Sequence, residues 1–198
     1  MAKAIALVDY DNVRPTQRET SPDFLEINLT KLTEGVCGAV RSMMGDEVDE
    51  LQVRLYGGWT LLNGRFTERG DWLVRRVSAA RGLRDGIRVL PEIALAIEQR
   101  RGCRLRGLFR NRSGLNEQKM VDSMICVDLL HFAKSFEGPI FLVSDDDDMV
   151  PALLAAGEAD RQTVCVLRHR EQGSGTNDDH LTSCRIRIEV LPPALRRT

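Results

Sequence analysis

The chain has 198 residues, of which 42% are hydrophobic and 29% are charged, and its formal net charge is −1. This composition excludes a disordered or fibrous protein, and the length predicts one domain over residues 1–198 with a sizeable core. No stretch approaches the roughly 20 apolar residues that cross a membrane, and the first residues do not follow a signal-peptide pattern. We therefore expect a cytoplasmic protein without a membrane partner.

The first half of the chain predicts strands and helices in alternation. An apolar strand over residues 4–8 stops at Asp9, and residues 14–24 form a turn-rich loop. A stripe of apolar residues predicts a helix over residues 24–44. A second strand begins at Leu51 and is closed by Gly57 and Gly58, a helix follows over residues 68–80, and a short strand lies within residues 88–95.

The second half continues the alternation. Residues 100–114 form either a hairpin or a basic loop. The next predicted elements are a helix over 117–134, a strand over 138–144, a helix over 149–159, a strand over 163–169, a connecting loop over 173–180 and a last strand over 186–191. Apolar strands that alternate with helices predict an α/β fold, with three α/β/α layers and a mostly parallel central sheet.

The cysteines and histidines show no metal-binding pattern. The five cysteines are widely spaced, without a Cys-x-x-Cys pair, and the three histidines do not cluster. Zinc ligands usually occur at short spacings, so we expect reduced thiols and no zinc site.

Acidic residues gather at three places. Asp9, Asp11 and Asn12 follow the first strand, Asp122 and Asp128 lie in one predicted helix, and Ser144 precedes four aspartates at positions 145–148. Ligands of parallel α/β sheets bind beyond the carboxyl ends of the strands, so we expect the first and third groups to converge. Carboxylates from separate elements form an all-oxygen site that suits Mg²⁺ or Mn²⁺, and such an ion activates water for attack on phosphorus.

Helix capping offers a simpler explanation for part of this pattern. Aspartates at a helix N-terminus interact with backbone N–H groups and with the helix dipole, which accounts for Ser144, for one or two of the four aspartates, or for Asp122. It does not account for all four. Asp128 lies six positions after Asp122 and points to roughly the opposite side of a helix, so the two do not face one ion. We expect Asp122 at the metal site because it lies nearer the helix start.

Three motifs, in this order along the chain, resemble the NYN domains, a branch of the PIN-like metal-dependent ribonucleases. They are an opening strand that ends in Asp-x-acidic-Asn (VDYDN), a Lys-x-x-Asp at a helix start (KMVD) and Ser-x-Asp-x-Asp before an apolar helix (SDDDDMVPALL). The resemblance extends from Ala4 to about Leu191. It implies one NYN domain with a PIN-like, Rossmann-like architecture.

The resemblance also implies a catalytic, metal-binding acidic pocket. Its expected ligands are Asp9, Asp122, Asp146 and Asp148, supported by Asn12, Asp11 and Ser144. Asp145 stands where the family commonly has glycine, and Met149 replaces a common aromatic residue. If the backbone of the aspartate run is extended, Asp146 and Asp148 point to one side and the other two aspartates to the opposite side.

Basic residues concentrate between the second strand and the second acidic group. Residues 54–119 contain 15 Lys or Arg and 6 Asp or Glu, whereas residues 137–160 contain 7 acidic residues and no basic one. A basic insert around residues 98–116 is the densest part, and arginines at this density contact phosphates. We expect nucleic-acid contacts from Lys119, Arg104, Arg106, Arg110 and Arg112. A solvated basic surface is the alternative.

These patterns favour a Mg²⁺- or Mn²⁺-dependent endoribonuclease that hydrolyses phosphodiester bonds in single-stranded or structured RNA. A haloacid-dehalogenase-like phosphatase is a second hypothesis, because VDYDNV also resembles the opening motif of that superfamily, with Asp9 as nucleophile and Asp11 as acid/base. That hypothesis gives Asp122 no role. A third hypothesis is an RNA-binding NYN module without catalysis. DNA cleavage stays open, and a homodimer is compatible with the sequence although no motif predicts one.

Overall fold

A single mixed sheet forms the centre of the molecule. The computed structural model describes residues 2–13, 21–60, 65–95, 108–110, 116–118, 120–158, 163–168 and 177–191. The sheet strands are β1 (Lys3–Asp9), β2 (Glu50–Tyr56), β3 (Gly82–Arg84), β4 (Ile87–Ile93), β7 (Ile140–Val143), β8 (Val164–Arg168) and β9 (Arg187–Val190). Their order is β3-β4-β2-β1-β7-β8-β9, and every neighbouring pair is parallel except β3 with β4.

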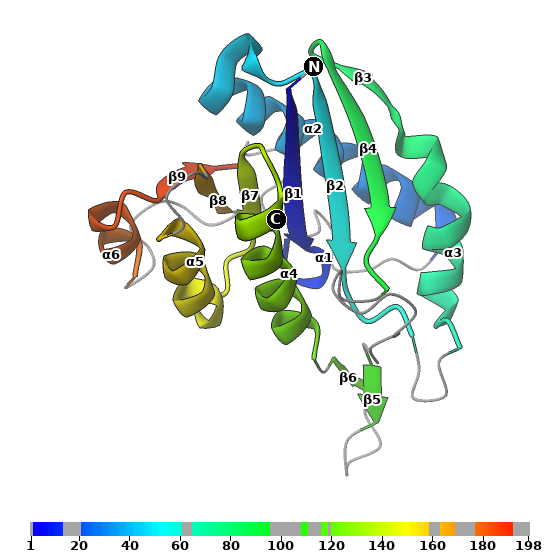
Figure 1. Ribbon diagram of the computed structural model, residues 1–198. Helices are drawn as coiled ribbons and strands as arrows, with labels where there is room; N and C mark the ends of the chain where they lie inside the picture. The colour runs from blue at the N-terminus through cyan, green and yellow to red at the C-terminus, as the bar shows by residue number, and fades with distance from the viewer. Residues whose placement is uncertain are drawn as a thin grey trace.

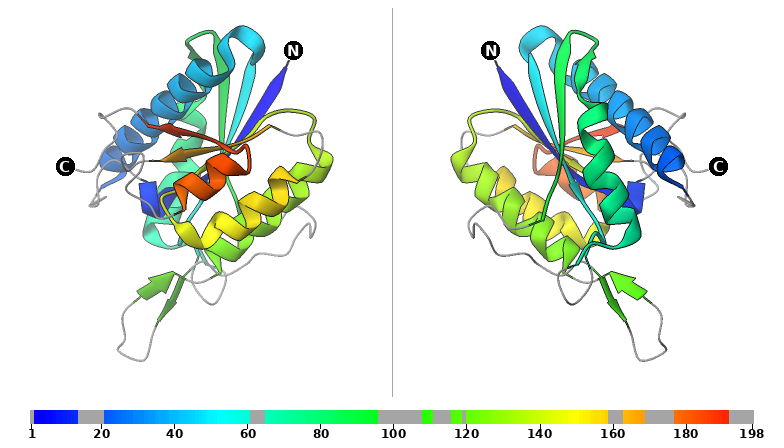
Figure 2. Two further views of the ribbon diagram at one scale, coloured as in Figure 1. Left: turned by 90° about the vertical axis from the view of Figure 1, so that its left-hand side faces the viewer. Right: turned by 90° about the vertical axis from the view of Figure 1, so that its right-hand side faces the viewer.

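Helices cover both faces of this sheet. The helices are α1 (Tyr10–Val13), α2 (Pro22–Met44), α3 (Glu68–Arg76), α4 (Val121–Ser135), α5 (Val150–Gly157) and α6 (Asp178–Ser183), and the short 3₁₀ helices are η1 (Gly45–Glu47), η2 (Val77–Ala80) and η3 (Asp147–Met149). In Figure 1, α4 and α5 lie in front of the sheet and α2 lies behind it, and Figure 2 shows the same layers edge-on. The predicted three-layer α/β/α fold is confirmed.

Residue alternation along β1 explains why both faces are covered. Ala4, Ala6 and Val8 pack in one core with the apolar stripe of α2, and Ile5 and Leu7 pack in the other core with α4 and α5. A strand with apolar side chains on both faces can bury both only between two layers of helices. The central position of β1 therefore follows from its composition.

The ends of α2 follow from local sequence. The Ser21 side chain accepts a hydrogen bond from the Phe24 backbone N–H, and Pro22 occupies the first turn, where no intrahelical donor is needed. The helix stops at Gly45, whose φ of 58° is a left-handed value that favours glycine.

The strand order reverses between β1 and β7. The chain builds β1, β2 and β4 toward one edge and then returns to add β7, β8 and β9 on the other side of β1. At such a switch point the connections diverge, and ligands bind beyond the carboxyl ends of the strands. Val8 pairs in register with Val143, so the next residues, Asp9 and Ser144, leave the sheet side by side.

Several predicted boundaries are wrong. The helix predicted over 117–134 begins at Val121, because Met120 has a φ of 67° and Asn116–Gln118 form strand β6. Strand β6 pairs antiparallel with β5 (Leu108–Arg110), which makes this part of the chain a hairpin. The loop predicted over 173–180 ends in α6, and the short edge strand β3 was not expected. Among the described helices, none is long and apolar enough to cross a membrane.

Candidate metal centre

Three of the four expected ligands converge at the switch point. Asp9 ends β1, Asp122 lies in the first turn of α4, and Asp146 follows β7. One carboxylate oxygen from each lies within 4.8 Å of the other two. Within the described part of the chain this is the one group of three acidic, histidine or cysteine side chains at metal-binding distances.

The carboxylates of this group repel one another. Asp9 is only 3% exposed. Burial, followed by the charges of Asp122, Asp11 and Asp146, raises the pKa of Asp9 to about 7, although the hydrogen bond from Ser144 opposes the shift. The pKa of Asp122 is raised by burial and by the charges of Asp146 and Asp148. Asp9 and Asp122 therefore bind protons more tightly than free carboxyl groups, and a cation placed beside them would lower their pKa values.

Ser144 connects two of the three carboxylates. Its hydroxyl donates a hydrogen bond of 3.1 Å to Asp9 Oδ2, and its Oγ accepts a bond of 3.0 Å from the Asp146 backbone N–H. Ser144 is fully buried, and its bond to Asp9 is shielded from water, whereas the bond from the Asp146 N–H is partly buried. The expected supporting role of Ser144 agrees with this position.

The backbone is extended at Asp146 and enters a 3₁₀ helix at Asp147, so the condition of an extended backbone does not hold through the whole aspartate run. Asp146 Oδ1 accepts a hydrogen bond of 2.9 Å from the Asp148 backbone N–H and thereby caps η3 (Asp147–Met149). The strict two-sided alternation of a strand therefore does not apply. Asp148 is exposed and is not one of the three clustered carboxylates, but its charge raises the pKa of Asp122 and it lies beside the same site.

Asp11 is not one of the clustered carboxylates, although its charge contributes to the raised pKa of Asp9. Its Oδ2 accepts a hydrogen bond of 2.9 Å from the Gly58 backbone N–H, and its carboxylate forms an ion pair with Arg69. The Arg69 guanidinium also lies 4.7 Å from the centre of the Trp59 ring. Asp11 therefore ties the end of β1 to the segment after β2. No sequence motif indicated Arg69 or Trp59. Asn12, expected to support the site, lies partly exposed in α1.

Asp128 belongs to a separate buried network. The Tyr56 hydroxyl donates a hydrogen bond of 2.8 Å to Asp128 Oδ2, and Arg54 Nη2 lies 3.6 Å from the same oxygen. Asp128 is fully buried. Its charge is thus compensated inside the core, in agreement with the choice of Asp122 as the helix residue that reaches the site.

A buried arginine behind the turn was not expected. Arg168, at the end of β8, is 1% exposed and contacts Ser144, Asp147 and Asp178. The available sequence signal was a charged residue that ends an otherwise apolar strand.

The expected nucleic-acid contacts lie mostly outside the described residues. These are Lys119, Arg104, Arg106 and Arg112, while Arg110 belongs to β5 and its side chain is also outside the described part. The β5–β6 hairpin extends past the carboxyl edge of β2 and β4, on the side where α4 begins (Figures 1 and 2). Phosphate binding by this segment stays a prediction.

The site can be set against known proteins. No protein-family model, no curated protein and no solved structure matches the chain. The chemistry of the site therefore has to be inferred from the positions of its own side chains.

Proposed function

We propose that the protein is a metal-dependent ribonuclease of the NYN kind, which hydrolyses RNA phosphodiester bonds with Mg²⁺ or Mn²⁺. One observation carries the proposal: the carboxylates of Asp9, Asp122 and Asp146 come from three separate elements and approach within 4.8 Å at the switch point of the sheet. Evenly distributed surface acids or helix caps do not produce this convergence.

The donor set fits a hard divalent cation. All three groups offer oxygen, which suits Mg²⁺ and Mn²⁺ better than softer metals. Burial, and after it the charges of neighbouring carboxylates, raises the pKa of Asp9 to about 7, and a bound cation would offset the cost of ionising Asp9 there.

The protein's own residues would orient the reaction. Asp9, Asp122 and Asp146 would hold the ion, Ser144 would fix the Asp9 carboxylate through its 3.1 Å hydrogen bond, and exposed Asp148 would face incoming substrate or solvent. When bound, such an ion lowers the pKa of a coordinated water and neutralises charge on a phosphoryl oxygen. Arginines of the 98–116 insert would hold the phosphates of the RNA strand.

The contacts of Asp11 count against the phosphatase alternative. In that mechanism Asp11 has to transfer protons to and from substrate. Here its carboxylate is engaged by the Gly58 N–H and by Arg69, and it stabilises the turn after β1 instead. The phosphatase mechanism also leaves Asp122 without a role, although Asp122 is part of the cluster.

Cleavage of end-labelled single-stranded RNA tests the proposal. Wild type, Asp146→Asn and the control Asp46→Asn are each assayed with Mg²⁺, Mn²⁺ or EDTA, next to single-stranded DNA and p-nitrophenyl phosphate. We expect metal-dependent RNA cleavage by wild type and Asp46→Asn, and at least a hundredfold loss in Asp146→Asn. Full activity in EDTA would refute the metal site. Release of phosphate from the small ester without RNA cleavage would favour the phosphatase, and RNA binding without cleavage would favour a binding module.

A further inference from the structure

Arg168 occupies an unusual position for a charged residue. It is the last residue of β8, whose other residues are apolar and buried, and it is 1% exposed. β8 pairs in parallel with β7, and Leu167 is in register with Val143. Arg168 and Ser144 therefore leave neighbouring strands at the same level, which places the guanidinium under the turn that carries Asp146.

The guanidinium holds this turn at two points. Nη1 donates a hydrogen bond of 3.1 Å to the Ser144 carbonyl oxygen, and Nη2 donates one of 3.2 Å to Asp147 Oδ1. Nη2 also lies 3.1 Å from Asp178 Oδ1 of α6, a buried carboxylate. A planar guanidinium presents its donors at fixed angles, so two contacts on one short turn define its position better than one flexible contact would.

These contacts lead directly to the carboxylate cluster. The residue whose carbonyl binds Arg168 is Ser144, whose hydroxyl binds both Asp9 and the Asp146 backbone N–H. Asp147, the second contact, is adjacent in sequence to Asp146 and begins η3. A shift of Arg168 would therefore move Asp146 relative to Asp9.

The cost of burying Arg168 indicates that it has a purpose beyond packing. A buried charge is stabilised only when its hydrogen bonds are made, and pairs of this kind are often no more stable than apolar residues of similar volume. Within the described part of the chain, Arg168 Nε and Asp178 Oδ2 are buried without a hydrogen-bond partner. The network therefore contributes little net stability to the fold, but its directed hydrogen bonds fix the position of the turn.

We infer that Arg168 is a positioning residue of the metal site, and that Asp147 is the tether through which it holds the turn bearing Asp146. The role rests on the proposed metal site. It also gives two of the four consecutive aspartates different roles, since Asp146 faces the ion and Asp147 faces Arg168.

Binding of Mn²⁺ alone tests this role. The affinity is measured by titration calorimetry and by loss of the free-Mn²⁺ electron paramagnetic resonance signal, for wild type, Asp147→Asn, Arg168→Lys and Asp145→Asn. Asp145→Asn is the control because it removes the same charge from the same turn. Thermal unfolding in EDTA shows whether each variant is folded; Asp147 is partly exposed, so Asp147→Asn remains informative if Arg168→Lys does not fold.

We expect Asp147→Asn to bind Mn²⁺ about tenfold more weakly than Asp145→Asn, the lower end of the loss seen when outer partners of metal ligands are removed. Arg168→Lys should show a similar loss, since an ammonium cannot make both contacts of the fork. Equal affinities of Asp147→Asn and Asp145→Asn, with tight binding by wild type, would overturn the positioning role and leave the metal site intact. Absence of Mn²⁺ binding by wild type would overturn the metal site and, with it, the role.

Discussion

Replacing Asp9 by asparagine should make the metal-free protein more stable at alkaline pH while removing its metal binding. Asn has nearly the same shape as Asp and retains an oxygen that can accept the hydrogen bond from Ser144. What the substitution removes is the negative charge that lies, 3% exposed, next to Asp122 and Asp146. The variant therefore tests repulsion in the cluster without opening a cavity.

The expected magnitude follows from the pKa of Asp9, which is raised from 3.8 to about 7. Because the folded protein holds this proton more tightly than the unfolded chain, the group favours folding at low pH. That contribution declines as the pH rises from about 4 and is lost above about 7. At 1.36 kcal/mol per pKa unit, the full difference is about 4 kcal/mol, and about 3 kcal/mol of it falls between pH 5 and 8.5.

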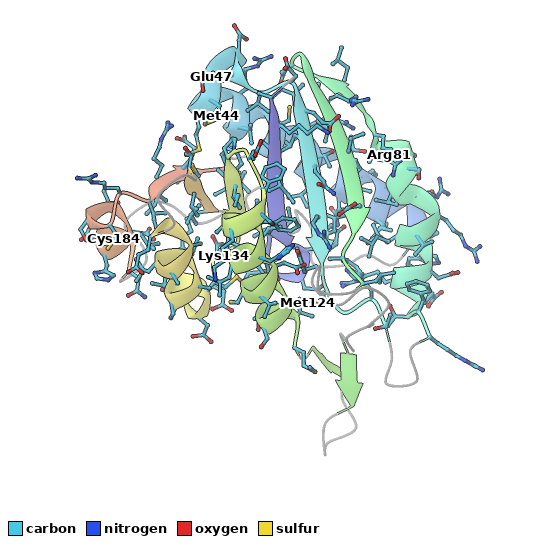
Figure 3. The ribbon with its side chains drawn as sticks, in the orientation of Figure 1. Met44, Glu47, Arg81, Met124, Lys134 and Cys184 are labelled. Carbon is cyan, nitrogen blue, oxygen red and sulfur yellow. The ribbon has the colours of Figure 1, made fainter. Side chains whose placement is uncertain are left out.

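Urea unfolding in EDTA at pH 5 and pH 8.5 measures this difference. We expect the free energy of unfolding to fall by about 3 kcal/mol more in the wild type than in Asp9→Asn when the pH is raised over this range. The control Asp46→Asn removes an exposed carboxylate near Met44 and Glu47, which Figure 3 places at the opposite end of the molecule from Met124 in α4. Its pH dependence should parallel that of the wild type. Parallel curves for the wild type and Asp9→Asn would refute the raised pKa of Asp9, and with it the cost of holding a charged carboxylate at this buried position.

Three further results are expected. Mn²⁺ should raise the melting temperature of the wild type at pH 8 but not that of Asp122→Asn, because only a complete site binds the ion in the folded state; equal shifts in a thermal scan would contradict this. Asp128→Ala should lower the free energy of unfolding by about 3 kcal/mol, since Arg54 and Tyr56 lose a buried partner, and it should leave Mn²⁺ affinity unchanged by calorimetry. Gly70→Ala should lower the free energy of unfolding, measured with urea, by about 1–3 kcal/mol because the added Cβ would overlap the Trp59 carbonyl oxygen. Gly38→Ala should instead raise the free energy of unfolding by about 0.5–1 kcal/mol, because Gly38 lies in the middle of α2 and an added Cβ would meet no atom within 4 Å. If both glycine variants changed the free energy of unfolding in the same direction, the contact with Trp59 would be shown to be soft.

Part of the candidate site could be predicted from the sequence because its signals are local. A strand that is apolar throughout and stops at Asp9 indicates a parallel sheet and marks its carboxyl end. The same holds for the strand that stops at Ser144. Residues at the carboxyl ends of parallel strands lie at one edge of the sheet whatever the strand order is, so this shared edge was foreseeable. The close approach of Asp9 and Asp146 also requires that β1 and β7 are neighbours.

The choice between Asp122 and Asp128 was also foreseeable, because the geometry of a helix separates residues six positions apart. The start of that helix was not, since the left-handed Met120 and the pairing of β6 with β5 depend on residues elsewhere in the chain. The conformation of the aspartate run was left open by the sequence for a related reason. Whether four aspartates are extended or form a turn depends on their hydrogen bonds, and those come from Ser144 and Arg168.

By itself, the sequence determined the layers and the edge of the sheet that carries the acidic residues, and its motifs indicated four candidate carboxylates, of which three cluster. Only the tertiary structure decided which partners hold them. Arg168 lies 21 residues from Asp147, and Arg69 lies 58 residues from Asp11; each meets its partner because separate elements end at the same edge of the sheet. Periodicity reports which way a side chain points within its own element, whereas a contact between elements depends on strand order and register, which no local pattern encodes.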